Sequence, residues 1–160
     1  MKGEESSVRS VDQDSLRENI SRPVRRVRVL VVDDDETIVS TLSLILRNLN
    51  YEVAVAYNGN DAIEVARRFL PNLLLSDVVM PGKDGVEAAM EIRQMLPDCS
   101  VLLISGSAQV IDIMEKARAQ WVHFELMAKP VHPTELLRRI EQLCRRATAS
   151  PQMPAQERAG

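Results

Sequence analysis

The chain has 160 residues, of which 45% are apolar and 27% charged, so it can bury one hydrophobic core without metal or disulfide staples. The net charge of −3 disfavours a general affinity for nucleic acid or for anionic membrane surfaces. The two cysteines, Cys99 and Cys144, form no CxxC pair. No apolar run is long enough to span a bilayer or to form the core of a secretion signal. We therefore expect a soluble cytoplasmic protein with reduced, buried thiols.

The two ends of the chain differ in composition from its centre. Residues 1–25 are rich in Ser, Asp, Glu and Arg, which predicts a flexible N-terminal arm with a possible short helix at 15–20. Residues 148–160 are polar and contain two prolines, which predicts a disordered tail. The residues between them, 26–147, form one predicted domain.

Within this domain, short apolar runs alternate with apolar stripes at helical spacing. In chain order, the predicted elements are a strand at 27–32, a helix at 38–49, a strand at 53–55, a helix at 62–70, a strand at 73–75, a helix after Pro81-Gly82 to about 95, a strand at 101–104, a helix at 110–117, a strand at 124–127 and a helix from Pro133 to about 144. The unbroken apolar strands are typical of a sheet covered on both faces. The alternation predicts an α/β fold with a doubly wound parallel sheet.

Polar side chains follow four of the five predicted strands. Asp33 and Asp34 follow the first strand, Asp77 the third, Ser105 the fourth and Lys129 the fifth. Functional groups of such folds gather at the carboxyl ends of the strands, so we expect these five side chains at one edge. Carboxylates about 5 Å apart repel each other by about 3 kcal/mol per pair. The acids must therefore take up protons or bind a cation, and their hard oxygens suit Mg²⁺.

Each of these segments also fits a purely structural role when it is taken alone. Acids complement a helix N-terminus, a serine can cap a helix, and most lysines are simply solvated. Together they fit phosphoryl chemistry better. A carboxylate can attack phosphorus and form an acyl phosphate, while an ammonium and a hydroxyl bind the other phosphoryl oxygens.

Four segments resemble the bacterial two-component response-regulator receiver domain. They are residues 29–36 (VLVVDDDE), 74–85 (LLSDVVMPGKDG), 102–106 (LLISG) and 128–130 (AKP), in the order and spacing of that family. The resemblance implies a flavodoxin-like (β/α)5 fold with strand order 2-1-3-4-5. We expect a stand-alone receiver domain with no output domain.

The resemblance also implies a role for each site residue. Asp77 resembles the phosphoacceptor, which takes its phosphoryl group from a histidine kinase, a histidine phosphotransfer protein or a small phosphodonor. Ser105 and Lys129 resemble the residues that bind the phosphoryl group. Asp34 resembles the direct ligand of Mg²⁺ (or Mn²⁺), Asp33 a ligand through water, and Asp77 and the backbone carbonyl of Val79 complete the metal site.

The family resemblance further implies how such a switch signals. The protein catalyses only its own phosphorylation and dephosphorylation. The expected output is contact with an effector protein or a second copy through the fourth helix, fifth strand and fifth helix. Arginine pairs in the last helix indicate a solvated face rather than nucleic-acid binding.

The sequence departs from the family pattern around the fifth predicted strand. Leu126 stands where many receivers carry Tyr or Phe, so we expect signalling without rotation of an aromatic ring there. Phe124 is expected in the core and His123 at the surface or in a loop.

Val79 flanks the acceptor together with Ser107 and cannot orient a water molecule, which predicts slow self-dephosphorylation.

Two alternatives remain open at this point. Residues 33–37 also fit the Asp-x-Asp-x-Thr signature of haloacid-dehalogenase-like phosphatases, with Asp33 as nucleophile and Asp35 as acid and base. That reading leaves Asp77 unexplained and lacks the family's later acidic motif. The second alternative is a pseudo-receiver that binds partners without taking phosphate.

Overall fold

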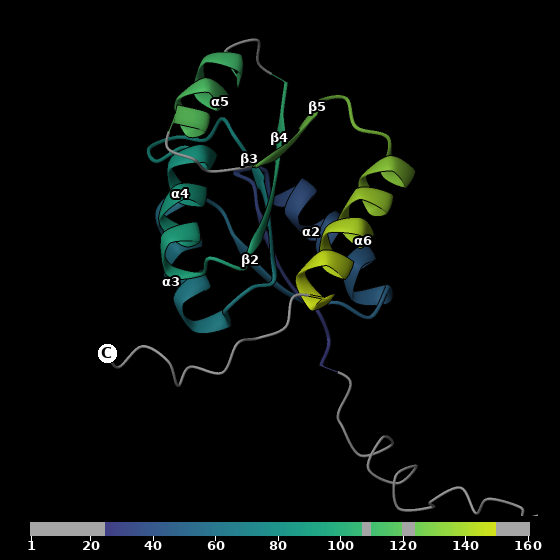
Figure 1. Cartoon of the computed structure of the whole chain (residues 1–160). Helices are drawn as coiled ribbons and strands as arrows, with labels where there is room; N and C mark the ends of the chain where they lie inside the picture. Colours follow the sequence, from purple (N-terminus) through teal and green to yellow (C-terminus); the bar gives the residue numbers. More distant parts are fainter. Residues whose placement is uncertain (1–24, 107–109, 120–123, 150–160) are drawn as a thin grey trace, which may run out of the picture.

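Strands and helices alternate strictly through residues 25–106, 110–119 and 124–149, the part of the chain that the computed structural model describes (Figure 1). The elements are β1 (Arg28–Val32), α2 (Glu36–Asn48), β2 (Glu52–Ala56), α3 (Gly59–Phe69), β3 (Leu73–Asp77), α4 (Gly85–Met95), β4 (Ser100–Ser105), α5 (Val110–Ala119), β5 (Glu125–Ala128) and α6 (Pro133–Ala149). The predicted order of elements is confirmed.

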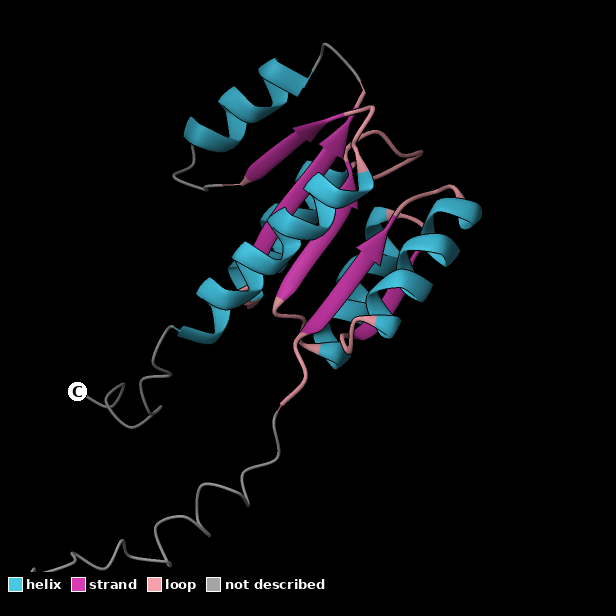
Figure 2. Ribbon diagram, turned by 90° about the vertical axis from the view of Figure 1, so that its right-hand side faces the viewer, coloured by secondary structure: helices cyan, strands magenta, loops and turns pink. Residues whose placement is uncertain are grey.

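All five strands are parallel and form one sheet in the order β2-β1-β3-β4-β5 (Figure 2). This confirms the predicted doubly wound, flavodoxin-like arrangement. The register pairs Val32 with Ser76, Asp77 with Ile104, and Ser105 with Ala128. The carboxyl ends of β1, β3, β4 and β5 therefore lie next to each other at one edge of the sheet.

Two helical layers cover the sheet. Helices α2 and α6 pack on one face, and α3, α4 and α5 pack on the other (Figure 1). Successive strand residues point to opposite faces, so Val31 and Leu75 join the α2–α6 core while Leu30 and Leu74 join the other core. Burial on both faces explains the unbroken apolar runs of the central strands.

Side-chain caps fix where three helices begin. Asp35 caps α2, Asn58 caps α3 and Asp84 caps α4, each by accepting hydrogen bonds from backbone N–H groups of the first turn. Caps of this kind contribute about 1 kcal/mol each. They also set the direction in which the chain leaves β1, β2 and the loop after β3.

Some boundaries differ from the predicted ones. β3 and β4 run on to Asp77 and Ser105, so both site residues are the last residues of strands. α6 reaches Ala149, two residues into the predicted tail. Phe124 is buried, as predicted for a core residue. Most of the N-terminal arm with its possible helix, the tail from residue 150, Ser107 and His123 lie outside the described residues.

Cys99 and Cys144 are both buried and form no disulfide, as predicted. Within the described ranges, no helix combines the length and the apolar character that a bilayer-spanning segment needs.

The arginine pairs of α6 are partly engaged in ion pairs. Arg139 and Arg146 lie 2.7 Å and 3.1 Å from the carboxylate of Glu125 on β5.

Candidate metal and phosphoacceptor site

The acids that follow β1 have different surroundings. Asp33 is buried, and its Oδ1 accepts a hydrogen bond from the backbone N–H of Asp35 at 2.9 Å. Asp34 is exposed. Asp35 turns away to cap α2, accepting from the N–H groups of Thr37 at 2.8 Å and Ile38 at 3.3 Å. The chain thus directs one acid inward, one outward and one into the helix.

Asp77 ends β3 and is held by contacts on both its carboxylate and its backbone. Its Oδ1 accepts a hydrogen bond from the N–H of Val78 at 2.9 Å, and its carbonyl oxygen accepts one from the hydroxyl of Ser76 at 2.8 Å. Only 9% of Asp77 is exposed. A Cβ atom on Gly85 would overlap the carbonyl oxygen of Asp77, so the first residue of α4 must be glycine for α4 to approach so closely.

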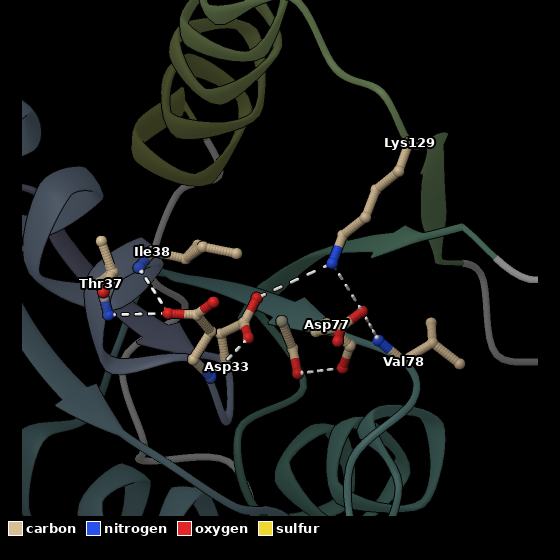
Figure 3. A network of polar contacts seen from close by, with 8 residues as sticks. Asp33, Thr37, Ile38, Asp77, Val78 and Lys129 are labelled. Carbon is tan, nitrogen blue, oxygen red and sulfur yellow. Dashed lines mark hydrogen bonds and ion pairs between the residues drawn. The ribbon is translucent and has the colours of Figure 1, made fainter.

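Lys129 reaches the two buried acids from the end of β5. Its backbone N–H donates to the carbonyl oxygen of Ser105 at 2.9 Å, which ties the two strand ends together. Its Nζ lies 3.4 Å from Oδ1 of Asp77 and 3.9 Å from Oδ2 of Asp33 (Figure 3). Ser105 is buried beside it at the end of β4.

The three aspartates form a compact group of potential metal ligands. One carboxylate oxygen of each of Asp33, Asp34 and Asp77 lies within 4.8 Å of the others. Burial raises the pKa of Asp33; the charges of Asp77 and Asp34 add to this rise, while the N–H of Asp35 and the ammonium of Lys129 oppose it. A divalent cation would relieve the repulsion. The hard oxygens and the exposed side of Asp34 fit Mg²⁺, which keeps several of its waters.

The loop after β3 carries Val79, whose side chain is 55% exposed. The N–H of Gly85 donates to the carbonyl oxygen of Val78 at 2.8 Å, which closes the loop. Lys83 forms an ion pair with Glu91 of α4. A Cβ atom on Gly59 would lie 2.5 Å from the carbonyl oxygen of Lys83, so the loop also rests on the start of α3.

The structure therefore brings together the predicted Asp33, Asp34, Asp77 and Lys129, with Ser105 at the same sheet edge. Sequence reasoning did not find the supporting contacts of Gly85, Lys83 and Glu91. The close approach at Gly85 follows from how α4 packs on β3, and nothing in the local sequence signals it. The ion pair spans eight residues and two different elements, so no periodic pattern indicates it.

Comparison with known proteins agrees with this site. The family model described as the response regulator receiver domain matches residues 29–141, most of the chain. The chain belongs to the response regulator receiver domain family. Its members are parts of two-component systems, so the receiver domain described here belongs to a signalling family.

Solved structures of other receiver domains are similar over nearly their whole length. A putative response regulator from Chloroflexus aurantiacus is 30% identical with a TM-score of 0.65, and the match covers 76% of this chain and 99% of that one. A CheY-like receiver domain protein from Methanospirillum hungatei is 25% identical with a TM-score of 0.71, covering 79% and 100%. The chemotaxis protein CheY4 of Vibrio cholerae is 25% identical with a TM-score of 0.67, covering 74% and 99%.

The geometry also bears on the phosphatase alternative. That alternative assigns acid and base catalysis to Asp35, yet Oδ1 of Asp35 is occupied by the cap of α2. The aspartates that gather as potential metal ligands are Asp33, Asp34 and Asp77. The phosphatase alternative leaves Asp77, one of these three, without a role.

Proposed function

We propose that this receiver domain is a phosphorylation-activated switch that accepts a phosphoryl group on Asp77. The donor is the phosphohistidine of a histidine kinase or of a histidine phosphotransfer protein. Asp33, Asp34, Asp77 and the backbone carbonyl of Val79 would hold Mg²⁺ (or Mn²⁺). The observation that carries the proposal is the buried carboxylate of Asp77 with the Lys129 ammonium 3.4 Å away.

Each side chain has a defined task in this proposal. The carboxylate of Asp77 attacks phosphorus in line with the bond to the donor nitrogen. The N–H of Val78 orients this carboxylate, and the hydroxyl of Ser76 holds the backbone carbonyl of Asp77. Lys129 pairs with a phosphoryl oxygen, and the Ser105 hydroxyl donates to another. When bound, the metal ion supplies neutralising charge to the phosphoryl oxygens. The chain catalyses only this gain and loss of its own phosphoryl group.

We infer that the output is a protein contact on the face of α5, β5 and α6. Ile111 on α5 and Leu126 on β5 are large exposed apolar residues of this face, with exposures of 68% and 36%. Arg139 and Arg146 surround Glu125 at its other side. An apolar centre with a charged border suits a protein partner, either an effector or a second copy. The proposal places this exchange in the cytoplasm.

Phosphorylation can be tested on three forms of the chain, namely wild type, Asp77→Asn and Asp33→Asn. Each is incubated with Mg²⁺ and phosphoramidate, and intact mass is measured together with phosphate release. We expect wild type to gain the mass of one phosphoryl group and Asp77→Asn to gain none. If Asp77→Asn still releases phosphate catalytically and Asp33→Asn does not, the result would instead support the phosphatase alternative.

A further inference from the structure

An apolar cavity of about 680 Å³ adjoins the phosphoacceptor site. It lies between α2 and α6, over the carboxyl ends of β1, β3 and β4. Ile38, Thr41 and Leu42 line it from α2, Leu136 lines it from α6, and Val131 closes it from the loop between β5 and α6. Ile38 and Thr41 are exposed, so a small molecule can enter along α2. The cavity falls in the size range of small-molecule sites, roughly 300–1,000 Å³.

One end of this cavity carries an excess of negative charge. Asp33, Asp77 and Lys129 form part of its lining, so two carboxylates face one ammonium. Asp34 adds a third carboxylate, with an oxygen within 4.8 Å of one oxygen on each of the other two acids. In the metal-free protein, this end of the cavity therefore attracts a positive charge and repels a negative one.

Lys129 leaves room for another cation at the two buried acids. Its Nζ lies 3.4 Å from Oδ1 of Asp77 and 3.9 Å from Oδ2 of Asp33, whereas a charge-assisted hydrogen bond measures about 2.7–2.9 Å. The carboxylates can therefore accept from a second cationic donor. Figure 3 shows the side chain of Ile38 extending from α2 toward the space between Asp33 and Lys129, so the apolar wall begins next to the charged groups.

We propose that this cavity binds a small organic monocation with an apolar body, such as an alkylammonium ion, and that this ligand and Mg²⁺ exclude each other. The ammonium group lies at Asp33 and Asp77, and the alkyl chain lies between α2 and α6. A neutral molecule would leave the excess charge unpaired, and an organic anion would be repelled by it. The ligand and the metal neutralise the same carboxylates, so each weakens the binding of the other.

The binding site itself does not depend on phosphorylation. Its effect on signalling rests on the proposed function, because a chain that holds the ligand lacks the metal ion that phosphoryl transfer to Asp77 needs. The ligand would then keep the switch in its unphosphorylated form.

The charge preference is tested with three probes that share one alkyl chain, namely hexylammonium, hexanol and hexanoate. Their dissociation constants are measured by NMR titration of the full chain at neutral pH. Without metal, we expect hexylammonium to bind about tenfold more tightly than hexanol, and hexanoate to bind more weakly than hexanol. Saturating Mg²⁺ should weaken hexylammonium by about tenfold or more and affect hexanol much less. Asp33→Asn removes the excess charge of the lining, so the preference for hexylammonium over hexanol should fall toward one.

The place of the alkyl chain is tested by its length and by filling the cavity. Butylammonium has two CH₂ groups fewer than hexylammonium, and we expect it to bind about tenfold more weakly. Thr41→Trp fills the cavity from the side and should abolish this dependence on chain length. Leu44→Trp is the matched control and should keep it, because Leu44 is 62% exposed on the same helix and does not line the cavity.

Four results would each overturn the inference: hexanol that binds as tightly as hexylammonium, hexylammonium binding that Mg²⁺ leaves unchanged, butylammonium that binds as tightly as hexylammonium, or a dependence on chain length that persists in Thr41→Trp. The proposed function is tested separately by phosphorylation with phosphoramidate and Mg²⁺. If Asp77 is phosphorylated and hexylammonium does not bind, only the inference fails. If hexylammonium binds in competition with Mg²⁺ and Asp77 takes no phosphoryl group, the site stands and the proposed function fails.

Discussion

Asp33 and Asp34 are neighbours in the chain but differ in what surrounds them. Asp34 is in contact with solvent, whereas Asp33 is buried beside Asp77. Burial is the main cause that raises the pKa of Asp33, and the ammonium of Lys129 only partly offsets the nearby negative charge. The charged form of Asp33 therefore costs folding free energy in the metal-free protein.

Replacing Asp33 by Asn should relieve this cost, because the amide oxygen can still accept the N–H of Asp35. We expect Asp33→Asn without metal to be more stable than wild type at neutral pH by on the order of 1 kcal/mol. A carboxyl whose folded pKa is raised loses stability as pH rises through that pKa. The advantage of the variant should therefore vanish in acid, where Asp33 is protonated in both folded and unfolded chains.

Urea unfolding at several pH values measures this difference. Added Mg²⁺ provides the control, because it should stabilise wild type and have a much smaller effect on Asp33→Asn. A metal-free variant that is less stable than wild type at neutral pH would contradict this account of Asp33.

Val79 follows the acceptor by two residues in the chain and has an apolar side chain, with 55% of its surface exposed. Its side chain has no donor or acceptor with which to orient an attacking water molecule. We predict that the phosphorylated protein decays over minutes or longer, and that Val79→Asn shortens the lifetime several-fold. Decay is followed by intact mass after removal of the donor, with Leu44→Asn as the control. Decay of the wild type within seconds would contradict the prediction.

The two cysteine thiols are shielded from solvent on opposite sides of the sheet. Burial raises the pKa of Cys99 and that of Cys144 from 9.0 to about 12 each. Because the folded state keeps both thiols protonated, their contribution to the stability of the fold is complete below pH 9. It is lost as pH rises toward 12. We expect slow labelling by thiol reagents at neutral pH, rapid labelling in urea, and stability that falls in this alkaline window. Rapid labelling of the native protein would show that the thiols are accessible.

At the scale of elements, the contact between β3 and the start of α4 positions the acceptor. Gly85 allows the α4 backbone to lie against the carbonyl of Asp77. We predict that Gly85→Ala destabilises the protein by about 2 kcal/mol and weakens Mg²⁺ binding, because the end of β3 must move. Thermal unfolding and calorimetry of Mg²⁺ binding measure both effects.

Gly106→Ala is the matched control for this substitution. Its Cβ atom would meet only the side chain of Lys129, at 3.6 Å and 3.9 Å, which is ordinary contact. We expect near wild-type stability for this variant. A Gly85→Ala protein with unchanged stability and Mg²⁺ affinity would contradict the positioning role of the contact.

The elements were predictable to different degrees. Central strands such as β3 are buried on both faces and have unbroken apolar runs, which the sequence displays directly. β5 lies at the edge with alternating partial exposure, so its signal is weaker and its start lay one residue from the predicted one. The meeting of Asp33, Asp77 and Lys129 followed from the rule that the ends of parallel strands share one edge. The contact at Gly85 depends on packing between elements and had no such signal.

At the scale of the whole molecule, the cavity between α2 and α6 arises from two helices that are far apart in the chain. Periodicity predicts which face of each helix is apolar, but not the space that remains between them. Ile38 belongs to the predicted apolar stripe of α2, yet it is 37% exposed and lines this cavity. The cavity could therefore be recognised only from the structure.

The central claim is that the molecule folds so that one particular carboxylate captures a phosphoryl group. Reduction of the phosphorylated chain with borohydride converts an aspartyl phosphate to homoserine, and peptide mass spectrometry then locates the modified position. We predict homoserine at position 77 in wild type treated with phosphodonor and Mg²⁺, and none in a sample without donor. Homoserine at position 33 or 34, or at no aspartate, would contradict the account.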